Sequence, residues 1–411
     1  MIKYIINIVR LLKFDNSLSK LKKCDVLLFC SDNDRGISLE NKAYAHLLDT
    51  FKEDLEKVGL SCISIAHPGS ILTNEKAYGS PISINRSYTF VILKKVFYKF
   101  GFIKNNPEVT LYQNIFKKAQ NKILITIGIG ASISTASRLE NILHLELLHS
   151  VGHHSIPWQW DKKPIKHIPQ GVLSLDSVST KTFSRLSLNS DFIVKEIPHP
   201  FLKRFLENDI PDEWKVKKVN TNYRKEILVS LEWIFADKEK YPELYGILEN
   251  GIFYKELEDV IKETQDEIYW RFRFHPVQLR QKEKYKKQFD TVDILTKRYK
   301  NVDWIESTRV PFFSVVRNCD GMITMQSHAC YEASYIGVQS LALSPALRNQ
   351  EKYKNLLNDL EEQGYVIKSE AKLEFILNWV KTVEKKQPNL INFDSNKYDE
   401  VIDWIKSKIN K

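Results

Sequence analysis

No cysteine of this sequence belongs to a CxxC pair, and the number of cysteines, five, is odd. Three of them lie in or beside apolar, strand-like runs, so we expect buried thiols in a reducing cytoplasm and no disulfide framework. The sequence also lacks an apolar run long enough to span a bilayer, and no small-residue cleavage site follows its N-terminal segment. These absences exclude a secreted, disulfide-stapled domain and predict a cytoplasmic protein without a signal peptide.

Dense basic blocks with interleaved aromatic residues are missing as well. The 61 Lys and Arg residues outnumber the 51 Asp and Glu residues, and the resulting net charge of +10 favours an anionic partner. Because the lysines are dispersed along amphipathic helices, we expect that this partner is not a nucleic acid.

The N-terminal residues 1–14, MIKYIINIVRLLKF, have an amphipathic pattern. On a helix, five apolar side chains would share one face and the basic Lys3 and Arg10 would share the other. This pattern suits a helix that lies on the inner face of the cytoplasmic membrane, and a helix packed on its own domain is the alternative.

The chain shows no internal repeat or low-complexity tract, and its 411 residues exceed the size at which a single core keeps growing. Strand-like runs alternate with helical segments in both halves, which is typical of parallel α/β layers. A polar segment, 208–226, has no apolar period and separates the halves. We therefore predict an α/β protein with two Rossmann-like, doubly wound domains that face a central cleft, over residues 1–210 and 225–411.

Apolar runs give the expected strands, which are 24–30, 61–67, 122–130, 142–150, 171–177, 191–200, 226–233, 268–276, 302–307, 321–327 and 339–345. Helical periodicity gives the expected helices, which are 41–59, 244–263, 280–299, 311–319 and 329–337. An aromatic-rich stretch at 70–105 is expected to be less regular.

Polar side chains follow two of the expected strands of the second half. His275 ends one strand, Gln326 and Ser327 end another, and Glu332 lies in the first turns of the next helix. Because the carboxyl ends of parallel strands meet at one edge, these residues should converge on a ligand there. His275, Ser327 and a helix N-terminus suit a phosphate, and Arg273 adds positive charge. Glu332 suits the two hydroxyls of a ribose, so the pattern predicts a nucleotide site.

Several of these segments resemble bacterial glycosyltransferases of the GT-B class. MQSHACYEASYIGVQSLALSP (325–345) resembles their donor-nucleotide segment, and RFHP (273–276) resembles the His-Pro motif of surface-polysaccharide transferases. That group includes polysialyltransferases, Kdo transferases and polyol-phosphate transferases. Segments at 142–161, 168–186 and 197–206 are similar to transferases of capsule and O-antigen clusters, although His149-Ser150 stands where that family tends to have His-Gly.

The resemblance implies a transfer of sugar from a nucleotide-sugar donor to a capsule, O-antigen or lipopolysaccharide glycan, free or lipid-linked. It implies that His275 and Ser327 hold the donor phosphates, that Glu332 holds the ribose, and that the first domain supplies a general base. Asp34 in CSDNDRG (30–36) is the first candidate for that base, and His149 is the second. No cofactor and no metal are expected.

Other interpretations stay open at this stage. Asp32 could cap the next helix or pair with Arg35, and Asp32 with Asp34 matches the metal-binding DxD pattern of another glycosyltransferase class, although it follows the first strand directly. The histidines near 144–154 lack an acidic partner at ligand spacing, so we do not expect a zinc site. A UDP-N-acetylglucosamine 2-epimerase, a polyol-phosphate transferase and a silent nucleotide-sugar-binding subunit are the alternative functions.

Overall fold

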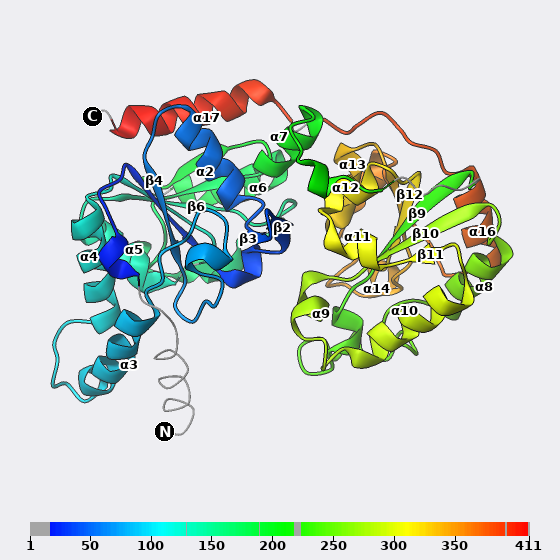
Figure 1. The fold of residues 1–411 in the computed structure, drawn as a ribbon, viewed down its shortest axis with the longest axis horizontal. Coiled ribbons are helices and arrows are strands. Elements are labelled where there is room, and N and C mark those ends of the chain that lie inside the picture. The colour runs from blue at the N-terminus through cyan, green and yellow to red at the C-terminus, as the bar shows by residue number, and fades with distance from the viewer. Residues whose placement is uncertain (1–16, 129, 189, 218–222, 391–392, 410–411) are drawn as a thin grey trace. The chain divides into compact units, whose positions relative to one another are not determined.

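The computed structural model describes residues 17–409, apart from 129, 189, 218–222 and 391–392. The predicted membrane helix, residues 1–14, lies outside the described residues. The chain forms two compact units, of which unit 1 comprises Met1–Glu207 and Asn392–Lys411 and unit 2 comprises Asn208–Ile391 (Figure 1).

Unit 1 is built on a parallel six-stranded sheet with the order β4-β1-β5-β6-β7-β8. Its strands are β1 (Val26–Cys30), β4 (Cys62–Ala66), β5 (Ile123–Thr126), β6 (Leu143–Leu147), β7 (Gly171–Ser174) and β8 (Ile193–Glu196), and a separate antiparallel hairpin consists of β2 (Ile37–Leu39) and β3 (Lys42–Tyr44). The strands β1 and β5 are fully buried, as expected for continuous apolar runs covered on both faces. The strand order reverses between β1 and β5, which makes that position the topological switch point of the sheet.

The helices of unit 1 are α2 (Leu48–Lys57), α3 (Asn85–Lys99), α4 (Pro107–Ala119), α5 (Ala131–Leu139), α6 (Ser177–Ser187), α7 (Pro200–Leu206) and α17 (Ser395–Ile409). Its 3-10 helices are η1 (Leu18–Lys20), η2 (Asp32–Asp34), η3 (Asn74–Lys76), η4 (Pro157–Lys162) and η5 (Ile165–His167).

Unit 2 is built on a second parallel six-stranded sheet, with the order β11-β10-β9-β12-β13-β14. Its strands are β9 (Lys225–Ser230), β10 (Ile268–Arg273), β11 (Val302–Asp303), β12 (Gly321–Thr324), β13 (Gln339–Ala342) and β14 (Val366–Lys368). Numbered along this unit, the strands have the order 3-2-1-4-5-6 of dinucleotide-binding sheets, and the switch point lies between β9 and β12.

The helices of unit 2 are α8 (Lys255–Glu263), α9 (Pro276–Arg280), α10 (Lys286–Arg298), α11 (Ile305–Arg309), α12 (Phe312–Val316), α13 (Ala329–Tyr335), α14 (Ala346–Asn349), α15 (Asn358–Glu362) and α16 (Leu373–Thr382), with 3-10 helices η6 (Asp212–Trp214) and η7 (Ile234–Ala236). Among the described helices, none combines the length and the apolar composition that a membrane span requires.

The C-terminal helix corrects the predicted domain boundary. The sequence predicts a second domain over residues 225–411, but the structure places Asn392–Lys411 in unit 1. Tyr398 of α17 donates a hydrogen bond to Asp54 over 2.6 Å, and Lys397 pairs with Glu196 at 2.7 Å. These partners all belong to unit 1.

Four further segments differ from the expectation. The helix expected at 41–59 begins only at Leu48, because 37–44 form the β2-β3 hairpin. The strand expected at 302–307 ends at Asp303, whose carboxylate accepts the amide hydrogens of Ile305 and Ser307 and so begins α11. The helix expected at 244–263 covers only Lys255–Glu263, whereas the supposedly irregular stretch at 70–105 contains α3.

Candidate functional site

His275 follows β10 and caps the short helix α9. Its Nδ1 accepts the amide hydrogen of Val277 at 3.1 Å, while the Gln278 side chain accepts the amide hydrogen of His275 at 2.8 Å. Burial, with the nearby Arg280 and Arg273, lowers the pKa of His275 to about 4, so the ring is neutral at pH 7. A neutral ring that accepts at Nδ1 carries its proton on Nε2. The cap therefore fixes His275 as an Nε2–H donor.

Arg273 is the last residue of β10, and Glu332 lies in α13. One nitrogen of Arg273, Nη1, donates to the carbonyl oxygens of Ser307 and Val310. Burial raises the pKa of Glu332 to about 7, although the positive charge of Arg273 opposes the shift. Burial likewise lowers the pKa of Arg273 to about 10 against the effect of Glu332. The charges of these two predicted residues therefore act on each other.

The other arginine of this strand, Arg271, forms ion pairs inside unit 2. Its guanidinium is buried and pairs with Glu226 at 2.6 Å and Glu306 at 3.3 Å. A buried arginine that is fully paired stabilises the sheet interior, and removing one partner would leave a costly charge. Of the two arginines in RFRFHP, only Arg273 lies with the candidate site residues.

Gln326 and Ser327 follow β12, and both side chains contact other protein groups. The side-chain oxygen of Gln326 accepts from the Ser344 hydroxyl at 2.7 Å, and the Ser327 hydroxyl accepts the amide hydrogen of Ala329 at 3.1 Å. These bonds shape the connection between β12 and α13. A direct contact of either side chain with a ligand stays a prediction.

Glu232, which the sequence reasoning missed, joins the two strands at the switch point of unit 2. It follows β9, and its Oε1 accepts from the Thr324 hydroxyl at 2.8 Å and from the amides of Met325 and Gln326 at 3.0 and 2.7 Å. Burial raises its pKa to about 7. An acidic residue two positions after the strand run EILVS was the signal available in the sequence.

Asp34 lies in η2, directly after β1 of unit 1. Its Oδ2 accepts the hydroxyl hydrogen of Ser31 at 2.7 Å and the Ser31 amide at 3.3 Å. Its other oxygen, Oδ1, forms no hydrogen bond with any residue that the structure describes. Asp34 is therefore held in place through one oxygen while the second can accept a proton or a hydrogen bond.

Asp32 neither caps the next helix nor pairs with Arg35, the two roles that the sequence left open. Asp32 accepts the amide hydrogens of Ile71 and Leu72 at 2.8 and 3.2 Å, so it holds a neighbouring loop and does not pair with Arg35. Over the described part of the chain, no three His, Cys, Asp or Glu side chains come together as a metal ion would require.

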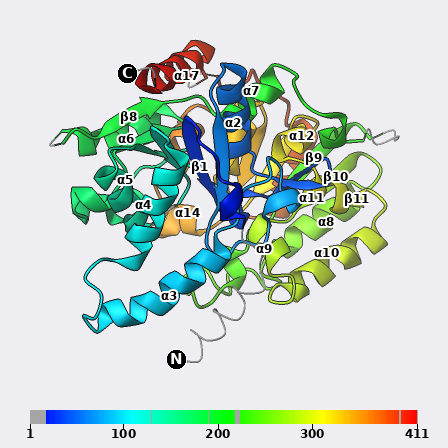
Figure 2. The same ribbon diagram turned by 60° about the vertical axis from the view of Figure 1, so that its left-hand side comes forward.

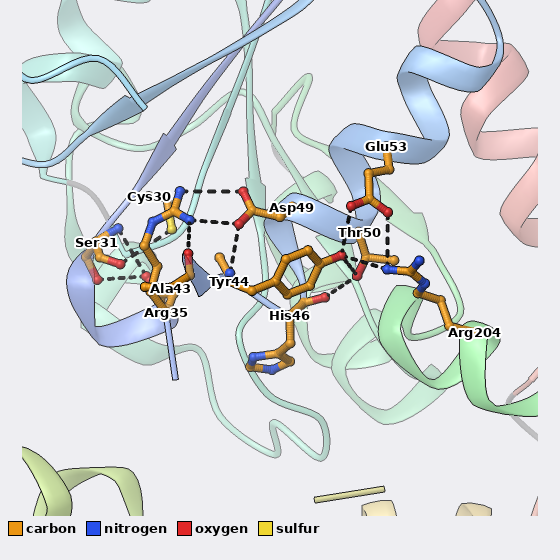
Figure 3. A network of polar contacts seen from close by, with 12 residues as sticks. Cys30, Ser31, Arg35, Ala43, Tyr44, His46, Asp49, Thr50, Glu53 and Arg204 are labelled. Atoms are coloured by element: carbon orange, nitrogen blue, oxygen red, sulfur yellow. Dashed lines mark hydrogen bonds and ion pairs between the residues drawn. The ribbon is translucent and has the colours of Figure 1, made fainter. Parts of the chain in front are cut away.

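Arg35 instead anchors the loop that carries Asp34 (Figure 3). Its guanidinium contacts Asp49 of α2 at 2.7 Å and donates to the carbonyl oxygen of Ala43 at 3.1 Å. Asp49 also accepts the amide hydrogen of Ala45 at 2.8 Å. Both charged side chains are 1% exposed, so the pair is shielded from water. Farther along α2, Glu53 pairs with Arg204 of α7 at 3.1 Å.

His149, the second candidate base, lies just beyond β6. Burial lowers the pKa of His149, and the negative charge of Asp34 opposes this shift. The two predicted bases are thus close enough to interact electrostatically. The His149 ring also lies 5.8 Å from the ring of Trp158, measured between centroids.

Glu146 is a second residue that the sequence reasoning missed. It is buried in β6, where it accepts from the Thr126 hydroxyl at 2.5 Å and from the Gly128 amide. Burial raises its pKa to about 8, and Asp34 adds to the rise. Thr126 also contacts Nε2 of the buried His144 at 2.8 Å, which removes His144 from any surface cluster of histidines.

Two parallel six-stranded α/β units, each with its polar residues at the carboxyl ends of the strands, define the GT-B class of fold. No family model matches the sequence, and no curated protein matches it either.

Solved structures do share the fold. MnaA of S. aureus, solved with UDP, has a TM-score of 0.55 and 11% identity over 94% of this chain and 97% of that one. The UDP-GlcNAc 2-epimerase of Methanocaldococcus jannaschii, in complex with UDP-GlcNAc and UDP, has a TM-score of 0.53 and 11% identity over 93% and 99%. The wall teichoic acid polymerase TagF has a TM-score of 0.53 and 12% identity over 100% and 96%. The predicted class of fold is confirmed.

Proposed function

We propose that the protein is a glycosyltransferase that moves a sugar from a nucleotide-sugar donor to a glycan or lipid-linked glycan acceptor of capsule, O-antigen or lipopolysaccharide assembly. One observation carries the proposal: the Nε2–H donor of His275, the charge of Arg273 and the carboxyl group of Glu332 all lie at or beyond the carboxyl ends of β10 and β12 in the unit 2 sheet. A diphosphate needs hydrogen-bond donors and positive charge, and a ribose diol needs a carboxylate. This set of groups supplies all three.

The proposed reaction divides the roles between the units. In unit 2, His275 and Arg273 bind the phosphate oxygens and stabilise the negative charge that develops as the bond from the sugar carbon to the phosphate oxygen breaks. In unit 1, Asp34 takes the proton of the acceptor hydroxyl while the new glycosidic bond forms, with His149 as the alternative base. The nucleotide leaves with the electron pair of the broken bond. Because His275 and Arg273 stabilise its negative charge, this scheme assigns no step to a metal ion.

A second candidate is a nucleotide-sugar epimerase, and Glu146 favours it. An epimerase must remove a proton from a sugar carbon and return one, and Glu146, whose pKa burial raises to about 8, interacts electrostatically with Asp34. A polyol-phosphate transferase would use the same phosphate-binding groups.

Incubation with CMP-, UDP- and GDP-sugars, with and without short glycan acceptors and with and without EDTA, separates these functions. A transferase releases nucleotide only when its acceptor is present, an epimerase converts the sugar without an acceptor, and a silent binding subunit does neither. A thermal-shift screen carried out beforehand identifies which nucleotide the protein binds, because a ligand at 100 times its Kd stabilises a protein by about 2.7 kcal/mol. Activity that EDTA abolishes and manganese restores would contradict the metal-free scheme.

The role of His275 can be separated from its helix cap. His275→Asn keeps an oxygen that can accept the Val277 amide hydrogen but lacks the distal N–H. We expect unchanged stability and a loss of about 1–3 kcal/mol in nucleotide-sugar binding, the size of a hydrogen bond to a charged group. Calorimetric titration measures the loss, and His275→Ala, which removes both functions, should lower stability as well. Native affinity in the Asn variant would show that His275 is only a cap.

The proposed contact of Glu332 with ribose has a pH signature. Because burial raises its pKa to about 7, the carboxyl is protonated below that pH and ionised above it. Only the carboxylate accepts hydrogen bonds from both ribose hydroxyls, so the preference for a ribonucleotide over its 2′,3′-dideoxy analogue should grow between pH 6 and pH 8. In Glu332→Gln the preference for the ribonucleotide should be about 1–3 kcal/mol smaller than in the native protein at pH 8, and it should not change with pH. Equal binding of the two nucleotides by the native protein at pH 8 would contradict the assignment.

A further inference from the structure

Helix α3 presents apolar side chains on the face that points away from unit 1. Phe90, Leu93 and Phe97 recur at helical spacing and are 58%, 44% and 54% exposed. Phe100 and Phe102, which follow the helix, are 71% and 80% exposed. We call these five residues the α3 patch. Helices on the surface of a soluble domain ordinarily turn polar side chains outward, so this arrangement needs an explanation.

The opposite face of α3 is already used for packing. Asn85, Thr89 and Val91 are buried, and Lys95 pairs with Glu108 of α4 at 2.6 Å. The α3 patch is therefore not the face by which this helix packs on the core of unit 1. In both views of the ribbon, α3 lies at the margin of unit 1 beside α4 (Figures 1 and 2).

The charged residues of the sequence segment that carries the patch are of one sign. Between Glu75 and Glu108 the sequence contains no acidic residue, whereas it contains the basic residues Lys76, Arg86, Lys94, Lys95, Lys99 and Lys104. Lys94 lies beside the apolar stripe on the helix, Lys99 is its last residue, and both are exposed. Exposed aromatic rings with lysines nearby, and no acidic residue between Glu75 and Glu108, match the interface of an anionic bilayer, where rings enter the headgroup region and ammonium groups meet phosphates.

A second copy of the chain fits the same surface less well. A twofold contact through the α3 patch would set the lysines of one copy close to those of the other, with no acidic residue of this segment to offset the repulsion. We propose that the α3 patch is the surface by which the protein binds an anionic phospholipid membrane. This inference deepens the proposed function, because a lipid-linked acceptor is presented at such a surface, but it is tested without any turnover.

The test is flotation with vesicles of phosphatidylcholine alone or with about 30% phosphatidylglycerol added. The native protein should bind the anionic vesicles only, and less at high salt. Phe90→Ser with Phe97→Ser should reduce the partition coefficient about tenfold or more, because two rings no longer enter the bilayer. Leu139→Ser with Ile305→Ser is the control, since these side chains are 60% and 65% exposed and lie outside the patch.

A second pair of variants tests the contribution of the lysines to vesicle binding. Lys94→Gln with Lys99→Gln should also reduce binding about tenfold or more, whereas Lys255→Gln with Lys262→Gln in α8 removes the same charge and should leave it unchanged. Native binding in the Phe variant, equal loss in the controls, or no binding by the native protein would overturn the proposal. So would a native dimer that the Phe variant separates in sedimentation velocity. Binding that only a deletion of residues 1–14 abolishes would assign the contact to the N-terminal segment instead.

Discussion

Asp34→Asn is expected to lower sugar transfer by at least ~10²-fold while nucleotide-sugar affinity stays native. The amide oxygen can still accept the Ser31 hydrogen bonds that hold η2, but an amide cannot take the proton of the acceptor hydroxyl. Binding and chemistry should therefore separate, with kcat reduced and the Kd of the donor unchanged. Single-turnover assays and calorimetric titration of the donor measure the two quantities.

The chain offers a matched control at the opposite end of the same strand. Asp25, just before β1, accepts the hydroxyl hydrogen and the amide hydrogen of Ser61 at 2.6 and 2.8 Å, the same pair of bonds that Asp34 makes with Ser31. Asp25→Asn should cost comparable stability and leave transfer unchanged. Near-native transfer in Asp34→Asn, together with a large loss in His149→Gln, would reassign the base to His149.

Asp49→Ala is expected to lower the free energy of unfolding by about 3–5 kcal/mol. The substitution leaves the Arg35 guanidinium buried without its carboxylate, and Arg35 is 1% exposed, so water cannot replace the lost partner. Arg35→Met combined with Asp49→Leu should recover most of the loss, because no uncompensated charge remains. Urea unfolding of the full chain measures each variant.

The control for this prediction lies on the same helix. Glu56 of α2 pairs with Lys52 at 3.0 Å and is 40% exposed, so water screens the pair. Glu56→Ala should cost less than about 1 kcal/mol. A loss of that small size in Asp49→Ala would show that the Arg35–Asp49 pair does not stabilise the loop that carries Asp34.

The parts of the fold that could be predicted are those with local signals. Runs such as VLLFC and GMIT are apolar on both faces, which predicts buried parallel strands, and the carboxyl ends of such strands meet at one edge. This reasoning places Asp34 and His275 just beyond strand ends, where the structure has them. It also assigned Arg273 and Glu332 to one edge of the sheet, since one closes a strand and the other lies in the first turns of a helix that follows another strand.

The rest depends on contacts between distant residues. Glu232 bonds the backbone 94 residues away, and Tyr398 reaches Asp54 across 344 residues, so no local pattern reports either bond. The outward face of α3 could not be assigned because aromatic residues occur on several sides of that helix, and only the packing against α4 shows which side is covered. The β2-β3 hairpin displaced an expected helix start because Glu40 and Asn41 adopt left-handed backbone angles there.

The return of α17 to unit 1 has a consequence for biosynthesis. Unit 2 is continuous in sequence, so its contacts can all form once residue 391 has left the ribosome. Unit 1 consists of two sequence segments, and the contacts of its strand β8 are complete only when α17 has been synthesised, because Lys397 of α17 pairs with Glu196 of β8. The later half of the nascent chain is therefore the first able to complete its fold, and until α17 arrives the surface around Asp54 and β8 stays open to chaperones and proteases.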